Sequence, residues 1–483
     1  ADVDLTLRAY QTIFGPFGYH INVVANPSAD SPLGAKFVPA GQIFSVNVTA
    51  VAWQAEDDLN DDRIPDGHNI ANSLARANLA NNPVINSFGK ENPPESIVLS
   101  SYLRLPLGGN NPGLGYEDHG VDERIITSFN LGTGTANNLY FDEVGIIELK
   151  AEITDGTYMG KNIHYTAFNT AYSQPVGRFY ADHFTLNSST LSEACTSGLN
   201  FSYLGQSFEA QFSVNAKSAR NTTVQNYAGD FIKLMPGDFD FAARDINTNT
   251  SLNARLNSHI TNTAWASGIG TIDTDLSLAR SALPDGPFTT VKIGTDFNDS
   301  DGAGLINSSK NIDTTGNGAN DSAEMGETEV RFGRLRLGDA HGPETNRLNI
   351  PLVVEYWQAP NWLINDDDSC TNLPLTAINY PAGPANIASN RTVNVGGGSA
   401  TGLYAGLNAG LVPFINGEID HAFSAPGQGN TGSFKTSIDL SGFPWLQFDW
   451  NADGNYSDSL TPNNQINFGS YRGHDRTIFW QDF

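Results

Sequence analysis

Hydrophobic and polar residues alternate along several stretches of the chain, and this alternation predicts β-strands. In residues 42–53 the apolar side chains fall on every second position, and residues 144–153, 348–356 and 434–440 repeat the pattern. A period of two places one set of side chains on a buried face of a sheet and the other set on a wet face. We therefore expect strands over these four stretches.

Helical patterns are scarce, whereas turn residues recur at short intervals. Residues 70–79 are consistent with a short helix, and residues 251–260 with a weaker one. Gly, Pro and Asn cluster in 108–115 and 425–432, which is typical of tight turns between strands. No fixed repeat is visible, which argues against a solenoid or a propeller. The pattern predicts an all-β protein with few short helices.

Two soft boundaries divide the chain into three parts. Pro and Gly punctuate residues 173–184, and a second stretch rich in Pro, Gly and Asn covers 380–400. A length of 483 residues is enough for several domains. We expect an Ig-like β-sandwich domain over 1–174, a β-rich middle domain over 175–385, and a C-terminal β-rich segment over 386–483 that packs with the middle domain.

Composition restricts the classes of partner. The chain has 52 acidic and 26 basic residues, a formal charge of −26. Nucleic acids and anionic membrane surfaces require clustered Lys and Arg, so we expect neither as a partner. Divalent cations and neutral glycans remain open. Only 16% of the residues are charged and 48 are Gly, while 39% are apolar, which is typical of a secreted β-protein rather than a disordered chain.

Targeting signals and cysteines bear on the compartment. No apolar run is long enough to cross a bilayer, so we expect no membrane insertion. Residues 1–6 are acidic and strand-like, and we interpret the chain as a mature product or a fragment of something longer. Cys195 and Cys370 fit one disulfide in an exported protein, with two buried free thiols as the alternative. Neither cysteine has the neighbours that a zinc site needs.

Residues 449–458 have the spacing of the first half of a calcium loop. Calcium takes about six to eight oxygen ligands, which such a loop supplies from alternate positions, with Gly at the sharp turn. Gly454 stands at that turn, whereas the twelfth position, a Glu in an EF-hand, is Leu460 here. A residue nearer the turn, or one from elsewhere in the chain, would have to complete the shell. The expected ligands are Asp449, Asn451, Asp453, Asn455 and Asp458.

Two further acidic loops carry a similar spacing. Residues 58–66 end like the calcium repeats of thrombospondin type 3, but Arg63 stands where those repeats have Gly, and a cation there would fill the site or block the turn. Residues 313–324 match a twelve-residue loop, with the poor ligand Thr315 at the third position, and 296–302 are a weaker variant. The expected ligands are Asp58, Asn60, Asp62 and Asp66 in the first loop and Asp313, Asn317 and Glu324 in the second.

Each acidic loop has a simpler interpretation as well. Asp and Asn are also the residues of hydrogen-bonded turns, so chance matches to a calcium loop are expected in a chain rich in both. Where calcium binds, we expect a structural ion that holds the loop rigid and does not itself carry the function.

Catalytic motifs are missing from the sequence. It contains no G-x-S-x-G, H-E-x-x-H or G-x-x-x-x-G-K-[ST]. His183 and His474 each stand beside an Asp, but adjacent residues of a strand face opposite sides, so we expect no ready dyad. We therefore expect no enzyme. Tryptophans that could stack on sugars, but that more often belong to a core, crowd the C-terminal third: Trp357, Trp362, Trp445, Trp450 and Trp480.

A series of segments carries a family resemblance. In chain order they are PVGRFYADHFTL (175–186), ACTSGLNFSYLGQSF (194–208), VRFGRLRLGDAHG (330–342), PLVVEYW (351–357), NDDDSC (365–370), SAPGQGNTGSF (424–434), PWLQFDWNADGNYSD (444–458) and FGSYRGHDRTIFW (468–480). This series resembles the C-terminal region of MshQ-like proteins, which are encoded with the mannose-sensitive haemagglutinin type IV pilus. The resemblance covers nearly the whole chain and is most specific from about residue 175 onwards.

The resemblance implies an exported protein that passes through the periplasm to the pilus or the cell surface. It implies a minor or tip component acting in adhesion, with pilins or other tip components as partners and a glycan or surface polymer as ligand. A purely structural or assembly factor without a ligand is one alternative, and a polysaccharide-active enzyme is another. Cys195 and Cys370 both fall inside the family-like segments, which supports their pairing.

Overall fold

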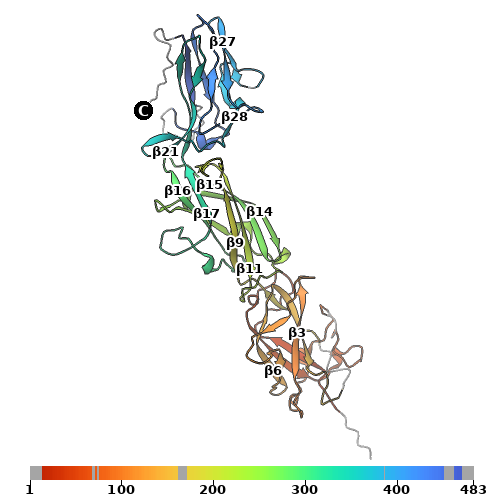
Figure 1. Cartoon of the computed structure of the whole chain (residues 1–483). Coiled ribbons are helices and arrows are strands. Elements are labelled where there is room, and N and C mark those ends of the chain that lie inside the picture. The colour runs from red at the N-terminus through yellow and green to blue at the C-terminus, as the bar shows by residue number, and fades with distance from the viewer. Residues whose placement is uncertain are drawn as a thin grey trace, which may run out of the picture.

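The computed structural model of the chain is all-β, which confirms the predicted fold class. It describes residues 13–67, 71–72, 75–161, 171–385, 387–450 and 462–469. Over these residues the chain forms strands β1 to β31, and the helical segments within them are short 3-10 turns. Figure 1 shows the strands grouped into three bodies that follow one another along a long axis. We call them the first body (18–179), the middle body (183–331) and the last body (333–468).

The first body consists of two four-stranded sheets. Its core lies between them, because Val46, Val48 and Ala50 of one sheet and Leu99, Leu149 and others of the second turn inward from alternating positions. One sheet has the order β1 (Gly18–Val23), β2 (Phe44–Val51), β6 (Thr133–Phe141), β4 (Leu114–Tyr116). The other has the order β5 (Ile125–Ile126), β3 (Ile97–Leu105), β7 (Gly145–Ile153), β8 (Val176–Phe179).

The middle body also pairs two sheets around one apolar core. A five-stranded sheet has the order β10 (Ser202–Tyr203), β17 (Ala323–Arg331), β16 (Phe288–Phe297), β12 (Phe239–Asp245), β13 (Thr250–Ser251). A four-stranded sheet has the order β14 (Leu256–Ala266), β15 (Ile269–Leu278), β11 (Phe208–Lys217), β9 (His183–Ser192).

The last body contains more and shorter strands around its own core. A three-stranded sheet has the order β18 (Gly333–Leu337), β21 (Leu352–Gln358), β22 (Asn361–Ile364), and a five-stranded sheet has the order β19 (Ala340–Gly342), β31 (Asn463–Phe468), β30 (Gly432–Ile438), β24 (Ile378–Tyr380), β25 (Gly383–Pro384). A four-stranded sheet has the order β20 (Leu348–Ile350), β29 (His421–Phe423), β27 (Gly398–Tyr404), β26 (Thr392–Val395). A two-stranded sheet pairs β23 (Asn372–Pro374) with β28 (Leu411–Pro413). The domain limits that the sequence suggested stay predictions.

The two helix expectations do not hold over the described residues. Residues 256–260 belong to β14, and 253–255 form only a 3-10 turn, so the predicted helix at 251–260 is wrong. Leu252, Leu256 and Ile260 are four apart, a spacing that fits both a helical face and one face of a strand. Within 70–79, the described residues form turns, a bend and the start of a 3-10 segment at Leu79, with no α-helix among them.

Candidate functional site: two junctions and an acidic loop

A buried ion pair joins the first body to the middle body. Arg178 lies on β8, and its guanidinium donates two parallel hydrogen bonds to the Asp301 carboxylate, at 2.5 and 2.6 Å. Both residues are buried: Arg178 is 5% exposed to solvent and Asp301 is 8% exposed. Lys36 of the first body also donates to the Asp301 carbonyl, at 2.6 Å. Two-pronged pairing of this kind fixes both the distance and the orientation of the partners.

Asp301 belongs to the weak calcium-like stretch 296–302, and the structure explains its acids. The carboxylate of Asp299 accepts the N–H groups of Asp301 and Ala303 at 2.9 Å and the Tyr227 hydroxyl at 3.1 Å. Burial raises the pKa of Asp299 to about 6. The positive charges in this stretch are therefore protein side chains: the Arg178 guanidinium and Lys36 from the neighbouring body, and Lys310, which pairs with Asp296 at 2.6 Å.

A second buried carboxylate crosses the same junction. Glu143, between β6 and β7, accepts the N–H groups of Gln225 and Asn226 from the middle body at 2.9 and 3.0 Å. Asn226 also exchanges hydrogen bonds with Asn110 of the first body, at 2.7 and 2.9 Å. Burial raises the pKa of Glu143. Because Val144 beside it packs in the middle-body core, the two bodies share apolar contacts as well as polar ones.

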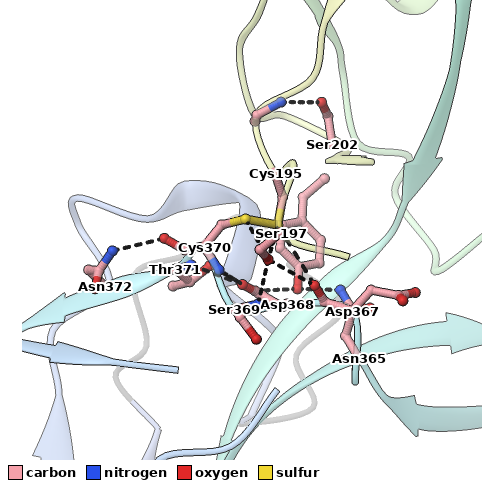
Figure 2. The surroundings of a disulfide bond; sticks show 12 residues. Cys195, Ser197, Ser202, Asn365, Asp367, Asp368, Ser369, Cys370, Thr371 and Asn372 are labelled. Atoms are coloured by element: carbon pink, nitrogen blue, oxygen red, sulfur yellow. Dashed lines mark hydrogen bonds between the residues drawn. A yellow bond between two sulfur atoms is a disulfide. The ribbon is translucent and has the colours of Figure 1, made fainter. Parts of the chain in front are cut away.

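The junction between the middle and last bodies is covalent. Cys195, in the segment between β9 and β10, forms a disulfide with Cys370 of the last body, 175 residues later, which confirms the predicted crosslink (Figure 2). The same segment extends into its neighbour, because Phe201 and Tyr203 are part of the last-body core. The middle body thus contributes side chains to a core that is otherwise built from residues 335–468.

Hydrogen bonds surround this crosslink. The buried Tyr203 hydroxyl donates to Asp368 at 2.8 Å and accepts from the Asn365 amide at 2.6 Å. Asp368 also accepts the N–H groups of Cys370 and Thr371, at 3.1 and 2.9 Å, which shapes the loop that carries the second cysteine (Figure 2). These contacts fix the loop that carries Cys370 beside the segment that carries Cys195.

Tryptophans of the C-terminal third seal the second junction. Trp357 and Trp362, on β21 and β22, pack against the middle-body core, and Trp362 meets Phe332 edge to face. The Arg334 guanidinium lies 3.9 Å from the Trp362 ring centroid. Trp445 packs against the last-body core, and Trp450 contacts Phe448. The four described tryptophans of this region therefore serve packing; Trp480 lies outside the described residues.

Arg280 completes the second junction. This middle-body side chain donates to the carbonyl groups of Pro444 and Gln447 in the last body, at 2.9 and 2.7 Å, and to that of Gly333 at 3.0 Å. Burial lowers the pKa of Arg280 to about 10, which still leaves the guanidinium charged at neutral pH. Three carbonyl groups of the last body thus accept hydrogen bonds from one half-buried cation of the middle body, which ties the two bodies together.

The loop at 58–66 folds around its first acidic residue. Asp58 accepts the N–H groups of Asp62 and Arg63 at 2.9 Å and the indole N–H of Trp53 at 2.8 Å. Arg63 adopts φ +67, the left-handed conformation that Gly takes easily, and its side chain is exposed. The arginine therefore does not block the turn, and along the described residues it forms no ion pair within the loop.

The sequence pattern did not identify Asp57, which directly precedes this loop. Asp57 is 3% exposed, and one of its carboxylate oxygens accepts the N–H of Asn78 at 2.8 Å. The other oxygen is buried and has no hydrogen-bond partner. The Asp57 carbonyl accepts the N–H of Asp66, the last predicted ligand, at 2.9 Å, which places Asp57 where the loop closes. A spacing template that begins at Asp58 cannot include it.

The loop at 313–324 satisfies its acids differently. Asp313 accepts the N–H groups of residues 316–318, and the hydrogen bond from Gly318 in particular lowers its pKa. At Asp321, burial by itself would raise the pKa of the carboxyl, but hydrogen bonds from Thr315 and Thr314 outweigh it and lower the pKa. Glu324, the predicted twelfth ligand, forms an ion pair with Lys292 at 2.9 Å. Hydrogen-bond donors and a lysine of the protein itself therefore satisfy the carboxylates of this loop, and metal binding here stays a prediction.

Most of the ligands predicted at 449–458 lie outside the described part of the chain. Of the ligands expected at 449–458, Asp449 is described, whereas Asn451, Asp453, Asn455 and Asp458 lie outside the described residues. Within the described ranges, no three His, Cys, Asp or Glu side chains gather as a ready-made metal site. Over the same ranges, no helix is long and apolar enough to cross a membrane.

The expectation for His183 is wrong in one respect. His183 and Asp182 do contact, with 2.8 Å between the ring Nδ1 and the carboxylate. The argument from strand alternation fails because β9 begins at His183, so Asp182 precedes the strand. The other ring nitrogen of His183 is buried without a partner. His474 lies outside the described residues.

Family models of DUF6701 match three consecutive parts of the chain: the second domain at 15–138, the third at 143–329 and the fourth at 331–483. None of the curated proteins compared with the chain matches it. The limit between the third and fourth matches coincides with the passage from middle to last body. The limit near residue 143 instead falls inside the first body, because it precedes β7, which pairs with β3 of the same body.

Among solved structures, the chain is remotely similar to two bacterial proteins. One is the adhesin InvE of Yersinia pseudotuberculosis, with 11% identity over 83% of this chain and 72% of the other, at a TM-score of 0.23. The second is the CupB6 tip adhesin of Pseudomonas aeruginosa, with 11% identity over 59% of this chain and 98% of the other, at a TM-score of 0.17.

Proposed function

The chain belongs to the DUF6701 family, and from this premise and its architecture we propose that it is an exported surface protein of a type IV pilus system that acts in adhesion. In this proposal it is a minor or tip component of the mannose-sensitive haemagglutinin pilus. Pilins or other tip components are its partners, and a glycan or surface polymer is its ligand. The link to that pilus rests on the resemblance of the segments from residue 175 onwards.

The observation that carries the proposal is the way the three bodies are joined. Ion pairs, hydrogen bonds and shared apolar contacts hold the first junction, and a disulfide with a shared core holds the second. Joints between domains are usually looser, and relative motion is the default where an interface is small and polar. Joints of the kind seen here favour an extended spacer that holds a binding end away from its anchor.

Calcium belongs to the proposal as a stabilising ion. The acidic loops supply hard oxygen donors, which is the chemistry that calcium prefers. An ion that binds only the folded chain adds roughly 2.7 kcal/mol at about a hundredfold excess over its dissociation constant. We expect chelation to lower the melting temperature, and an unchanged melting curve with and without chelator would remove calcium from the proposal.

A purely structural or assembly role is the second candidate, and one observation favours it. The four described tryptophans of the C-terminal third make packing contacts at the second junction or in the last-body core and keep only part of their surface exposed, which reduces the faces available for stacking on sugars. No sequence motif calls for an enzymatic role, and turnover of a polysaccharide would be needed to introduce one.

Immunogold labelling of this chain on intact cells with assembled filaments tests the proposal. Gold on filament tips is the expected result, and glycan arrays with the purified chain should then follow. Gold confined to the envelope, with none on filaments, would replace adhesion by an assembly role. Tip labelling without glycan binding would leave the chain as a structural component that carries no ligand.

A further inference from the structure

We propose that the outer edge of strand β14 is a docking site for an extended segment of another protein, which adds a strand to the middle body. The segment carries apolar residues at alternate positions and Lys or Arg between them. This inference goes beyond the proposed function, because it names a surface and the kind of segment that fits it. It depends on neither adhesion nor calcium.

The first observation is the length of this edge. β14 has 11 residues and ends the four-stranded sheet of the middle body, and no strand of the described residues pairs with its outer side (Figure 1). β9, at the other edge of the same sheet, has 10 residues. Over the described residues, every remaining edge strand of the molecule is at most 6 residues long. Long free edges invite further pairing, and proteins usually shorten, charge or cover them.

β14 has little of this protection. Residues 256–266 contain no Lys, Arg, Asp, Glu or Pro. One bulge at Thr261 interrupts the ladder with β15, and the stretch 262–266 then runs in regular register to the turn. β9 is partly covered, because Phe184 donates to the Gly304 carbonyl at 2.8 Å and accepts from the Ile306 N–H at 2.9 Å. Of the two long edges, β14 is therefore the open one.

The turn after β14 identifies the backbone groups that point outward. Its two residues, 267–268, have φ of +49 and +76, as in the two-residue turn that is closed by a hydrogen-bonded pair, here Ala266 and Ile269. Hydrogen-bonded and non-bonded pairs alternate from there, so Thr263 and Trp265 direct their N–H and C=O groups away from β15. Only an extended polypeptide repeats donors and acceptors at the spacing of these groups, which makes a strand the class of ligand.

The core beneath β14 is incompletely covered. Leu256, Ile260 and Trp265 pack against the middle-body core but stay partly exposed. The inward residues Ile272 and Leu276 of the neighbouring β15 are 0% and 1% exposed. Because side chains of a strand alternate between its two faces, an added strand with apolar residues at every second position would complete this cover.

The charge of the outer face selects the remaining positions of the segment. Glu209 of β11 lies directly opposite Asp275 of β15, and like charges at such positions repel. Asp273, on the same face, accepts only from the amides of Gln211 and Asn262, and along the described residues none of the three acids forms an ion pair. A strand beyond β14 would lie about 10 Å from β15, close to the distance over which salt screens charges. Basic residues are therefore favoured, and a second copy of this chain, with its charge of −26, is not.

The test uses the full chain and a short synthetic peptide with Val at alternate positions and Lys or Thr between them. We expect saturable binding, with hydrogen exchange measured at single residues slowed by about tenfold at Thr263 and Trp265, whose N–H groups have no strand partner in the free chain. Exchange at Ala264, which already bonds to β15, should change little. Unchanged exchange at 263 and 265 under saturating peptide would overturn the proposal.

Thr263→Pro removes one outward N–H, and an edge strand tolerates proline where the N–H faces solvent. This variant should keep its melting temperature and lose peptide binding, whereas the matched control Thr263→Val keeps the N–H and should bind as the native chain does. A peptide methylated on its backbone nitrogens tests the same bonds without altering the protein, and it should not bind. Equal binding of the methylated and unmethylated peptides would show that no ladder forms, which contradicts the proposal.

The basic character of the segment has its own test. Glu209→Gln combined with Asp275→Asn should weaken binding of the Lys peptide by about threefold at low salt, because two charges near the added strand are lost. Asp118→Asn, at an exposed acid of the first body, is the control and should leave binding unchanged. Equal affinity for a peptide with Glu in place of Lys would exclude a basic partner.

Sedimentation of the chain alone distinguishes the other occupant. We expect a monomer with free amides at 263 and 265. Dimers in which these amides are protected would assign the edge to a second copy of the chain and overturn the proposal. Neither peptide binding nor sedimentation depends on where the chain sits in the cell, so failure here leaves the immunogold test of the proposed function intact.

Discussion

The two junctions hold the three bodies together by different physics. At the first, a guanidinium of one body enters an acidic loop of the next, and buried carboxylates carry the joint. At the second, a disulfide and a shared core hold the bodies, and Arg280 on three carbonyl groups and an ion pair between Arg331 and Asp367 add to them. The first junction should therefore respond to charge and pH, whereas the second should respond to reducing agents.

Breaking the first junction should have the largest effect. Arg178→Met leaves the buried Asp301 carboxylate without its partner, which typically costs about 3–5 kcal/mol. We expect this loss in denaturant unfolding followed by intrinsic fluorescence. The double variant with Asp301→Leu should recover much of it, because both charges are then absent. Arg347→Met is the control, since its pair with Asp420 is exposed and should contribute less than about 1 kcal/mol. Equal losses for the two single variants would contradict a special role for Arg178.

Removing the crosslink should come next. Replacing Cys195 and Cys370 together by Ser frees a closed segment of 175 residues, and losses of about 2–4 kcal/mol are typical. Unfolding monitored with and without reductant should show the loss in the native chain and no further loss in the variant. Proteolysis should then cut the segment between β9 and β10, while the first junction stays protected. Cleavage near residue 301 instead would show that the two joints are coupled.

Mild acid should weaken the last body despite its crosslink. His421 is fully buried, stacks on Tyr404 with 4.4 Å between ring centroids, and has no partner for either ring nitrogen. Burial lowers its pKa to about 3, so the folded chain takes up this proton only in strong acid, whereas the unfolded chain takes it up near pH 6.5. Stability is thus lost as the pH falls below about 6.5, by about 2 kcal/mol at pH 5. His421→Phe should remove this slope, and a variant with an unchanged slope would exclude His421.

The first junction should respond to acid in the opposite direction, by a smaller amount. Burial raises the pKa of Asp299 to about 6, so the folded chain binds this proton more tightly than the unfolded chain does. Stability from this group therefore rises as the pH falls from about 7 to 5, by about 1 kcal/mol. Asp299→Asn should abolish the rise, measured as protection of the first body (18–179) and the middle body (183–331) by hydrogen exchange. Loss of protection in the native chain over this pH range would reverse the assignment.

Much of the strand pattern could be predicted from the sequence, because alternation reports burial directly. Residues 42–53 and 144–153 contain β2 and β7, and their inward positions are the core positions. The stretch 348–356 was predicted as one strand, but it is split between β20 and β21, with Pro351 between them. A proline has no N–H to contribute to the ladder, so the break has a local cause.

The joints could not be predicted in the same way. Arg178 and Asp301 lie 123 residues apart, and nothing in either local pattern identifies the other as its partner. The acidic loop at 296–302 resembled a metal site because its charge was visible in the sequence, whereas its cation was not. Asp57 was missed for a related reason, since the buried carboxylate oxygen that has no hydrogen-bond donor is visible only in the folded chain. The cysteine pair was accessible because only two candidates existed.

The disulfide also determines how the molecule would carry tension. A pull applied to the chain before Cys195 and after Cys370 passes directly through the sulfur atoms, and the 175-residue stretch between them is bypassed. At about 3.4 Å per extended residue, roughly 600 Å of chain cannot be drawn out while the crosslink is intact. The strands between the two cysteines, β10 to β22, with Trp357 and Trp362 among them, are then shielded from mechanical load, and the first body and the residues after Cys370 become the segments that stretch.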